Sequence, residues 1–137
     1  MTDLYAVDPG GTIGVCRSWK PGEYELRVFT TALQVVQWID GNMHGQLVHV
    51  VVEDFSGAGR LSGDAKHTMK QVGALELWCQ WRAIPCTIWP EQKRLSGLTE
   101  AERIGKELLP DLPAATRKHA IDATAHAVVW RRQNSGN

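Results

Sequence analysis

Apolar and polar residues in the first part of the chain are spaced as in β-strands. Residues 4–7 form a short apolar run that ends in Asp-Pro-Gly-Gly, and apolar residues resume over 12–16. The two runs predict a hairpin that turns through glycines. Alternate residues over 24–30 are apolar, as in a half-buried strand. Residues 47–52 are almost continuously β-branched and apolar and end in Glu53-Asp54, which predicts a central strand buried on both faces.

Helical spacing appears on either side of that central strand. Leu33, Val36 and Ile39 stand about one turn apart and predict a helix over residues 32–43. Residues 56–64 are rich in glycine and predict a loop, and residues 65–82 predict a long helix. The inward positions of this long helix are predicted to be Met69, Val72, Leu75 and Trp78 or Cys79. After Pro85, residues 86–89 predict a further strand.

The last third of the chain predicts two more helices. Thr99 and Glu102 have the spacing of a capping box, so we expect a helix from there to about residue 109, stopped by Pro110 and Pro113. A final helix is expected over residues 116–132, followed by a disordered tail over 133–137. Strands first and alternating elements later predict one α/β domain over residues 1–132, with a mixed central sheet flanked by helices.

Composition places the chain among ordinary globular proteins. It has 137 residues, of which 43% are hydrophobic and 22% charged. The N-terminus lacks the pattern of a secretory signal, and no apolar run approaches the roughly 18 residues of a membrane span. We therefore expect a cytoplasmic protein without a membrane partner. Cys16, Cys79 and Cys86 have no C-x-x-C spacing, which indicates neither a disulfide framework nor a thiolate zinc site.

The formal charge argues against a protein that binds nucleic acid through a uniformly basic surface. Fifteen basic and fifteen acidic residues cancel, whereas phosphate affinity normally comes from excess positive charge. The basic residues nevertheless occur in local pairs, which could segregate on one side of the fold or simply form solvated helix faces. The pairs are Lys66 and Lys70, Lys93 and Arg94, Arg103 and Lys106, Arg117 and Lys118, and Arg131 and Arg132.

Candidate metal ligands stand on three separate elements. Asp8 ends the first predicted strand and Glu53 ends the central one, while His119 and Asp122 lie at i and i+3 on one face of the last helix. Magnesium prefers carboxylate oxygens and keeps room for substrate phosphate. Two such ions about 3.5–4 Å apart can activate water and stabilise a leaving oxygen in phosphodiester cleavage. Together the four residues predict a site for one or two divalent cations.

Each of these residues has a simpler interpretation when taken alone. An aspartate before Pro-Gly is commonly a turn former, as Asp8 would be. Glu53 could face solvent at a strand end, and His119 with Asp122 could form a local helix pair. The joint pattern is what favours a metal site. His126, one turn beyond Asp122, is interpreted as a packing or surface residue and not as a ligand.

Three segments carry a family resemblance. LYAVDPGGTIGVC, VHVVVEDF and HAIDATAHAVVW resemble motifs of the RuvC family of Holliday-junction resolvases, and especially its short phage members. By that match Asp8, Glu53 and Asp122 take the roles of metal-binding acids. His119 stands where an aspartate is common, so it would bind metal through its imidazole or act as a general base.

The resemblance extends to the basic residues. WPEQKRLSGLTEAER resembles the family segment that places two basic residues near the phosphates, here Lys93, which would act in catalysis, and Arg103. The segment from residue 55 to the long helix resembles the region that reaches the junction centre and forms the dimer, where Trp78 and Trp81 are candidate contacts. The expected DNA-binding residues are Phe55, Arg60, Lys66, Lys70, Lys93, Arg94, Arg103 and Lys118.

The resemblance implies an RNase H-like fold and a crossover-junction endodeoxyribonuclease. We expect a homodimer with two Mg²⁺ or Mn²⁺ ions per site, in which Asp8 bridges the ions and each subunit nicks one strand of a four-way junction, a fork or a flap. No small-molecule substrate is expected, and a phage-encoded enzyme would act in the bacterial cytoplasm.

Three alternative classes share parts of this pattern. A YqgF-like nuclease that processes RNA would have the same fold and acids. A non-catalytic scaffold that binds branched DNA would keep the fold without needing the acids. The actin-like ATPases and sugar kinases share the opening hairpin, but they need two domains, for which 137 residues leave no space.

Overall fold

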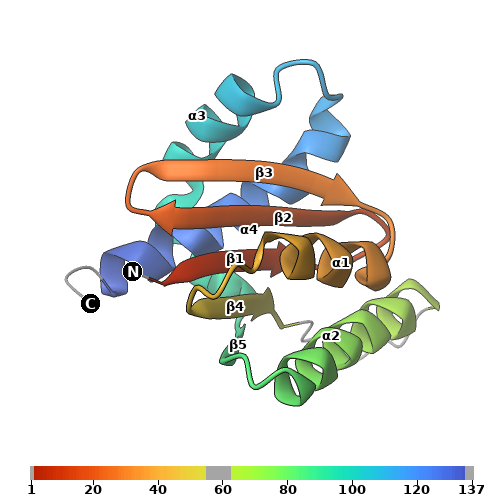
Figure 1. The fold of residues 1–137 in the computed structure, drawn as a ribbon. Coiled ribbons are helices and arrows are strands. Elements are labelled where there is room, and N and C mark those ends of the chain that lie inside the picture. Colours follow the sequence, from red (N-terminus) through yellow and green to blue (C-terminus); the bar gives the residue numbers. More distant parts are fainter. Residues whose placement is uncertain (1, 55–62, 135–137) are drawn as a thin grey trace.

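Strands within the described residues, 2–54 and 63–134 of this computed structural model, form one five-stranded sheet (Figure 1). The order across the sheet is β3-β2-β1-β4-β5. The bounds are β1 Asp3–Asp8, β2 Ile13–Lys20, β3 Glu23–Phe29, β4 Val48–Glu53 and β5 Cys86–Trp89. β1, β2 and β3 pair antiparallel, whereas β4 pairs parallel with both β1 and β5. The predicted mixed sheet is confirmed.

Helices cover both faces of this sheet. α1 and α2 pack on one face, and α3 and α4 pack on the other, following a 3₁₀ helix, η1 (Figure 1). The bounds are α1 Ala32–Asn42, α2 Gly63–Trp81, η1 Glu91–Gly97, α3 Leu98–Leu108 and α4 Ala114–Gln133. No helix in these described ranges is both long enough and apolar enough to cross a bilayer.

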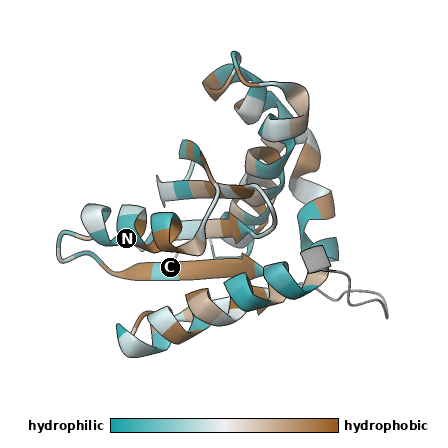
Figure 2. Ribbon diagram, turned by 90° about the vertical axis from the view of Figure 1, so that its right-hand side faces the viewer, coloured by the Kyte–Doolittle hydropathy of each residue, from teal (hydrophilic) through white to brown (hydrophobic). Residues whose placement is uncertain are grey.

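Alternation along the central strands builds a separate core on each face. Tyr5 and Val7 of β1 pack toward α1 and α2, whereas Leu4 and Ala6 pack toward α4. Successive strand side chains point to opposite faces, so a strand covered on both sides must be apolar throughout. Figure 2 shows a central strand that is almost entirely brown beside an α2 of mixed hydropathy.

The helix predicted over residues 32–43 is α1, which buries Val35 and Ile39 and leaves Leu33 63% exposed. The predicted inward stripe of α2 is wrong in part. Met69 on α2 is 48% exposed, whereas Leu75 is fully buried. The apolar residues of one helix can define more than one possible buried face. The angle at which the helix packs on the sheet decides which of these faces is buried.

The predicted capping box of α3 is also wrong. α3 begins at Leu98 directly after η1, and its N-cap is Gly97, which has no side chain with which to cap. A Cβ on this glycine would lie 2.7 Å from the carbonyl oxygen of Ala125, so contact with α4 requires glycine here. A capping box does occur at α1, where Thr31 and Gln34 bond reciprocally.

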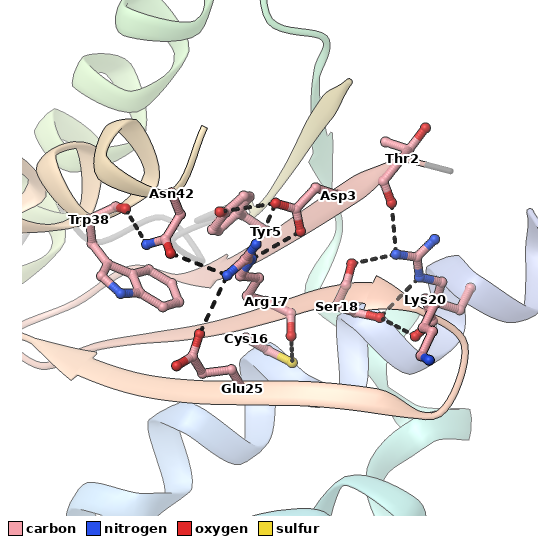
Figure 3. Close-up of polar contacts among 11 residues, drawn as sticks. Thr2, Asp3, Tyr5, Cys16, Arg17, Ser18, Lys20, Glu25, Trp38 and Asn42 are labelled. Carbon is pink, nitrogen blue, oxygen red and sulfur yellow. Dashed lines mark hydrogen bonds and ion pairs between the residues drawn. The ribbon is translucent and has the colours of Figure 1, made fainter. Parts of the chain in front are cut away.

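A buried polar network occupies the start of β1, at the opposite end from Asp8 (Figure 3). The Nε of Arg17 donates to Asp3 at 3.1 Å, its Nη1 donates to Asn42 at 3.2 Å, and Tyr5 donates to Asp3 at 3.2 Å. Arg131 of α4 donates to the backbone oxygens of Thr2 and Ser18. These contacts link β1, β2, α1 and α4, so both arginines stabilise the fold.

The close approach of α4 to β2 depends on Gly14. A Cβ built there would lie 2.0 Å from the carbonyl oxygen of His119, which is far inside any permissible contact. We predict that Gly14→Ala lowers the free energy of unfolding by about 3 kcal/mol, because helix and strand must separate. Urea unfolding measures this change.

Gly11→Ala is the matched control, because a Cβ on Gly11 meets no atom within 4 Å. The control should stay within about 0.5 kcal/mol of the wild type. Equal stability of the two alanine variants would contradict the proposed packing constraint.

Candidate active site

Asp8 and Glu53 are brought together by the parallel pairing of β1 with β4. Val7 lies opposite Val52 in the register, so the next residue of each strand emerges at the same edge of the sheet. The arrowheads of both strands point the same way in Figure 1. The side chain of Asp8 is 8% exposed and that of Glu53 is 16% exposed, and the two carboxyl groups are hydrogen-bonded to each other.

His119 reaches the same edge because α4 contacts β2. Gly14 is the register partner of Asp8 across the hairpin, and the absence of its side chain lets the backbone of His119 approach. The Nδ1 atom of His119 lies 3.5 Å from an Asp8 oxygen. This imidazole is 35% exposed and therefore open to solvent or substrate.

Asp122 lies one turn further along α4 and faces an arginine. The guanidinium of Arg94, from η1, lies 3.6 Å from an oxygen of Asp122 and 3.7 Å from an oxygen of Glu53. Burial raises the pKa of Asp122, and the charge of Arg94 partly offsets that increase. Arg94 is thus the counter-ion of two of the three predicted acids.

Asp8 and Glu53 share one proton. Burial, followed by the hydrogen bond and negative charge of Glu53, raises the pKa of Asp8 from 3.8 to about 9. Burial alone would raise the pKa of Glu53 as well, but hydrogen bonds from His126 and Asp8 and the charge of Arg94 lower it. At neutral pH Asp8 therefore carries the proton and Glu53 is ionised.

His126 is a packing residue, one of its two sequence-based interpretations, and it also contacts this site. Its ring is fully buried, and its Nε2 atom lies 2.9 Å from an oxygen of Glu53. The spacing of four residues from Asp122 places it on the same side of α4. That spacing was the one sequence signal that could have placed His126 at the site. The alanine-rich sequence around it did not indicate that Glu53 would be its buried partner.

The donor set fits Mg²⁺ or Mn²⁺ in its chemistry. Carboxylates of Asp8, Glu53 and Asp122 are hard oxygen ligands. Burial, together with the neighbouring Glu53 and Asp122, raises the pKa of Asp8, and a divalent cation would reverse that increase. In the arrangement seen, no three His, Cys, Asp or Glu side chains of the described chain converge closely enough to hold an ion. The Arg94 guanidinium instead lies across two of the acids.

Arg94 and Lys118 lie beside the acids, and Lys93 lies against Trp89. The Lys93 ammonium lies 5.5 Å from the centre of the Trp89 ring. Arg94 and Lys118 line an open groove of about 480 Å³ that also includes Asp122 and Lys106. Lys106 was not among the expected DNA-binding residues. It lies one helical turn beyond Glu102, which lines the same groove.

The other expected DNA-binding residues lie elsewhere. Arg103 pairs with Glu107 at 3.3 Å on a different side of α3, in a groove that also contains Glu100. Lys66 and Lys70 are exposed on α2, whose Gln71 bonds to Gly10 of the β1–β2 turn in both directions, at 2.8 and 2.9 Å. The expected contacts Phe55 and Arg60 lie outside the described residues.

Comparison with solved structures defines the fold. The chain superimposes on T. thermophilus RuvC in complex with a Holliday junction substrate with a TM-score of 0.67, 14% sequence identity and 98% coverage of both chains. A second Thermus thermophilus RuvC structure gives a TM-score of 0.54, 18% identity and 96% coverage of both chains. The chain has the RNase H-like fold of RuvC. No protein-family model and no curated protein sequence matches it.

The shared proton makes stability depend on pH when metal is chelated. Native Asp8 holds a proton between pH 3.8 and about 9 that the unfolded chain has lost, so wild-type stability falls as pH rises through this interval. Asp8→Asn removes the ionisable group. We predict that the variant exceeds the wild type in stability by a margin that grows with pH, by up to about 1.4 kcal/mol per unit.

Urea unfolding in EDTA at several pH values between 5 and about 8 measures this margin. A stability difference that does not change with pH would contradict the assignment of the proton to Asp8.

Proposed function

We propose that this protein is a metal-dependent endodeoxyribonuclease that cuts branched DNA, with four-way junctions as its main substrate. The observation that carries the proposal is the meeting of Asp8, Glu53 and Asp122 at one edge of an RNase H-like sheet. The fold likeness to a RuvC structure in complex with a Holliday junction supports the choice of substrate.

The three acids would hold one or two divalent cations, Mg²⁺ or Mn²⁺. Bound there, such cations supply an activated water and charge stabilisation for the leaving oxygen. Asp8 would have to lose its proton to hold a cation, so cation affinity is expected to rise with pH. Glu53 is already ionised and requires no such step.

Arg94 and His119 would act on the substrate from either side of the acids. The Arg94 guanidinium now neutralises Glu53 and Asp122, and it can turn to a phosphate once a cation takes over that task. His119 lies beside Asp8 with an exposed ring, which suits a general base for the attacking water.

The groove between α3 and α4 would take the phosphates of the cut strand. Lys106 and Lys118 line it, and it leads to Asp122. Arg117 also lines this groove, but it donates to the carbonyl oxygens of Leu109 and Leu112 and so is already engaged with the α3–α4 connection. A short basic groove favours recognition of DNA shape over general DNA affinity.

The catalytic test uses one variant for each acid. We predict that Asp8→Asn, Glu53→Gln and Asp122→Asn each lower the rate of Mg²⁺-dependent nicking of a labelled four-way junction by about 100-fold or more. Junction binding in a gel-shift assay should remain, because the phosphate-binding lysines are intact.

Asp54→Asn is the matched control, since Asp54 is exposed and follows Glu53 directly. It should cut at the wild-type rate. Three-way, flap and linear DNA and a four-way RNA junction complete the substrate panel. Undiminished nicking by Asp8→Asn would overturn the metal site, and faster cutting of RNA would favour a YqgF-like activity.

A homodimer through α2 would place two active sites on the two equivalent strands of a junction. Leu77 and Trp81 stand four residues apart on the outer face of α2 and are 66% and 78% exposed. Large apolar side chains side by side in solvent are typical of an interface. Trp78, the other expected contact, is half-buried against the core, which favours Trp81 as the main contact.

The dimer test replaces these two side chains. We predict that Leu77→Ser and Trp81→Ser each weaken dimerisation at least about tenfold, because a central aromatic or aliphatic contact commonly dominates an interface. Sedimentation velocity over a concentration series measures the dissociation constant.

Leu108→Ser is the control, because Leu108 is an exposed leucine of α3 on the opposite face of the sheet. It should leave dimerisation unchanged. A wild-type protein that stays monomeric at all concentrations, or equal weakening by all three variants, would contradict an interface on α2.

A further inference from the structure

His126 is a fully buried imidazole within an otherwise apolar stretch of α4. Its neighbours Ala125, Ala127 and Val128 are buried as well. The Nε2 atom lies 2.9 Å from Oε1 of Glu53, and the ring centre lies 6.2 Å from that of Trp89 on β5. An apolar side chain would fill this space without the cost of burying two polar nitrogens. The hydrogen bond to Glu53 is therefore the feature that requires explanation.

We propose that His126 is a positioning residue that holds the Glu53 carboxylate in the orientation needed to bind the cation. This inference rests on the proposed function, because it concerns the cation site of the same enzyme. A carboxylate at a strand end has rotational freedom, and a donor from a packed helix removes that freedom.

The two nitrogens of the ring differ in a way that specifies the tautomer. Nδ1 of His126 is buried and has no hydrogen-bond partner in the described part of the chain. With the hydrogen on Nε2, the ring donates to Glu53 and Nδ1 carries no hydrogen that would need an acceptor. The opposite tautomer would bury an unpaired N–H at Nδ1 and direct a lone pair at a carboxylate oxygen.

Arg94 cannot perform the same task throughout the reaction. Its Nη1 atom approaches the same Oε1 of Glu53 at 3.7 Å, but it comes from η1 at the open side of the site and also serves Asp122 and Glu91. When this guanidinium turns to a phosphate, Glu53 loses that contact. His126 is fixed in the interior and remains in place.

The test compares two substitutions of His126. His126→Gln keeps an N–H donor of similar reach, whereas His126→Leu keeps the bulk and removes the donor. Mn²⁺ affinity is measured by calorimetry, and junction nicking is measured under single-turnover conditions. We expect His126→Leu to weaken Mn²⁺ binding by about 10-fold to 100-fold, and His126→Gln to recover most of that loss.

Thr124→Val controls for damage to the helix. Thr124 is fully buried on α4 and donates to the carbonyl oxygen of Ala120 rather than to the site. This variant should lose stability in urea without losing Mn²⁺ affinity. Equal Mn²⁺ affinity in His126→Leu and the wild type, or equal losses in the Leu and Gln variants, would overturn the positioning role.

NMR of nitrogen-labelled histidine in the metal-free protein tests the hydrogen bond itself. The Nε2–H tautomer of His126 is expected, with a resonance that shifts in Glu53→Gln. The Nδ1–H tautomer would overturn the inference whatever the enzyme does. If the wild type cuts junctions and His126→Leu matches it in Mn²⁺ affinity and nicking, only the role of His126 is rejected. If the wild type neither binds Mn²⁺ nor cuts DNA, the proposed function is rejected.

Discussion

Burial of neighbouring carboxyl groups at one edge of the sheet is the constraint on which the site depends. Parallel pairing of β1 with β4 forces Asp8 and Glu53 to the same sheet edge, and α4 adds Asp122. The protein offsets this crowding in three ways without a metal: a proton on Asp8, the guanidinium of Arg94 and the hydrogen bond from His126. A divalent cation can replace the first two, and its binding energy must exceed what they contribute.

The position of α4 follows from small residues on three elements around it. Gly14 of β2, Gly97 of η1 and Gly105 of α3 each lie so close to α4 that an added Cβ would fall within 2.7 Å of its atoms. Gly14 and Gly97 lie against the α4 backbone and Gly105 lies against the Ile121 side chain, and such close contacts leave the helix little freedom to slide. Because His119, Asp122 and His126 project from this helix, close packing determines where the polar site forms.

Within a pair of nearby basic residues, one member can stabilise the fold while the other lies at the candidate site. Neighbouring residues on a helix point about 100° apart, so the two members of a pair can meet different partners even where both line one groove. Lys118 lines the groove beside Asp122, whereas Arg117 is held by carbonyl oxygens of the α3–α4 connection. Lys106 faces this groove, and Arg103 faces Glu107 instead. A net charge of zero is therefore compatible with a locally basic surface at the acids.

The sequence by itself determined the strands and the order of the elements, because strand burial repeats locally. It also offered Asp8, Glu53 and Asp122 as candidate acids, because their positions on the predicted strands and helix can be read from the sequence. It also predicted the mixed sheet, since hairpin and crossover signals are local. Only the tertiary structure decided which face of each helix is buried, that Arg94 meets two of the acids, and that His126 bonds to Glu53. Those outcomes depend on helix rotation and on contacts between residues far apart in the chain. His126 and Glu53, for example, are 73 positions apart. Local sequence patterns predict neither helix rotation nor such distant contacts.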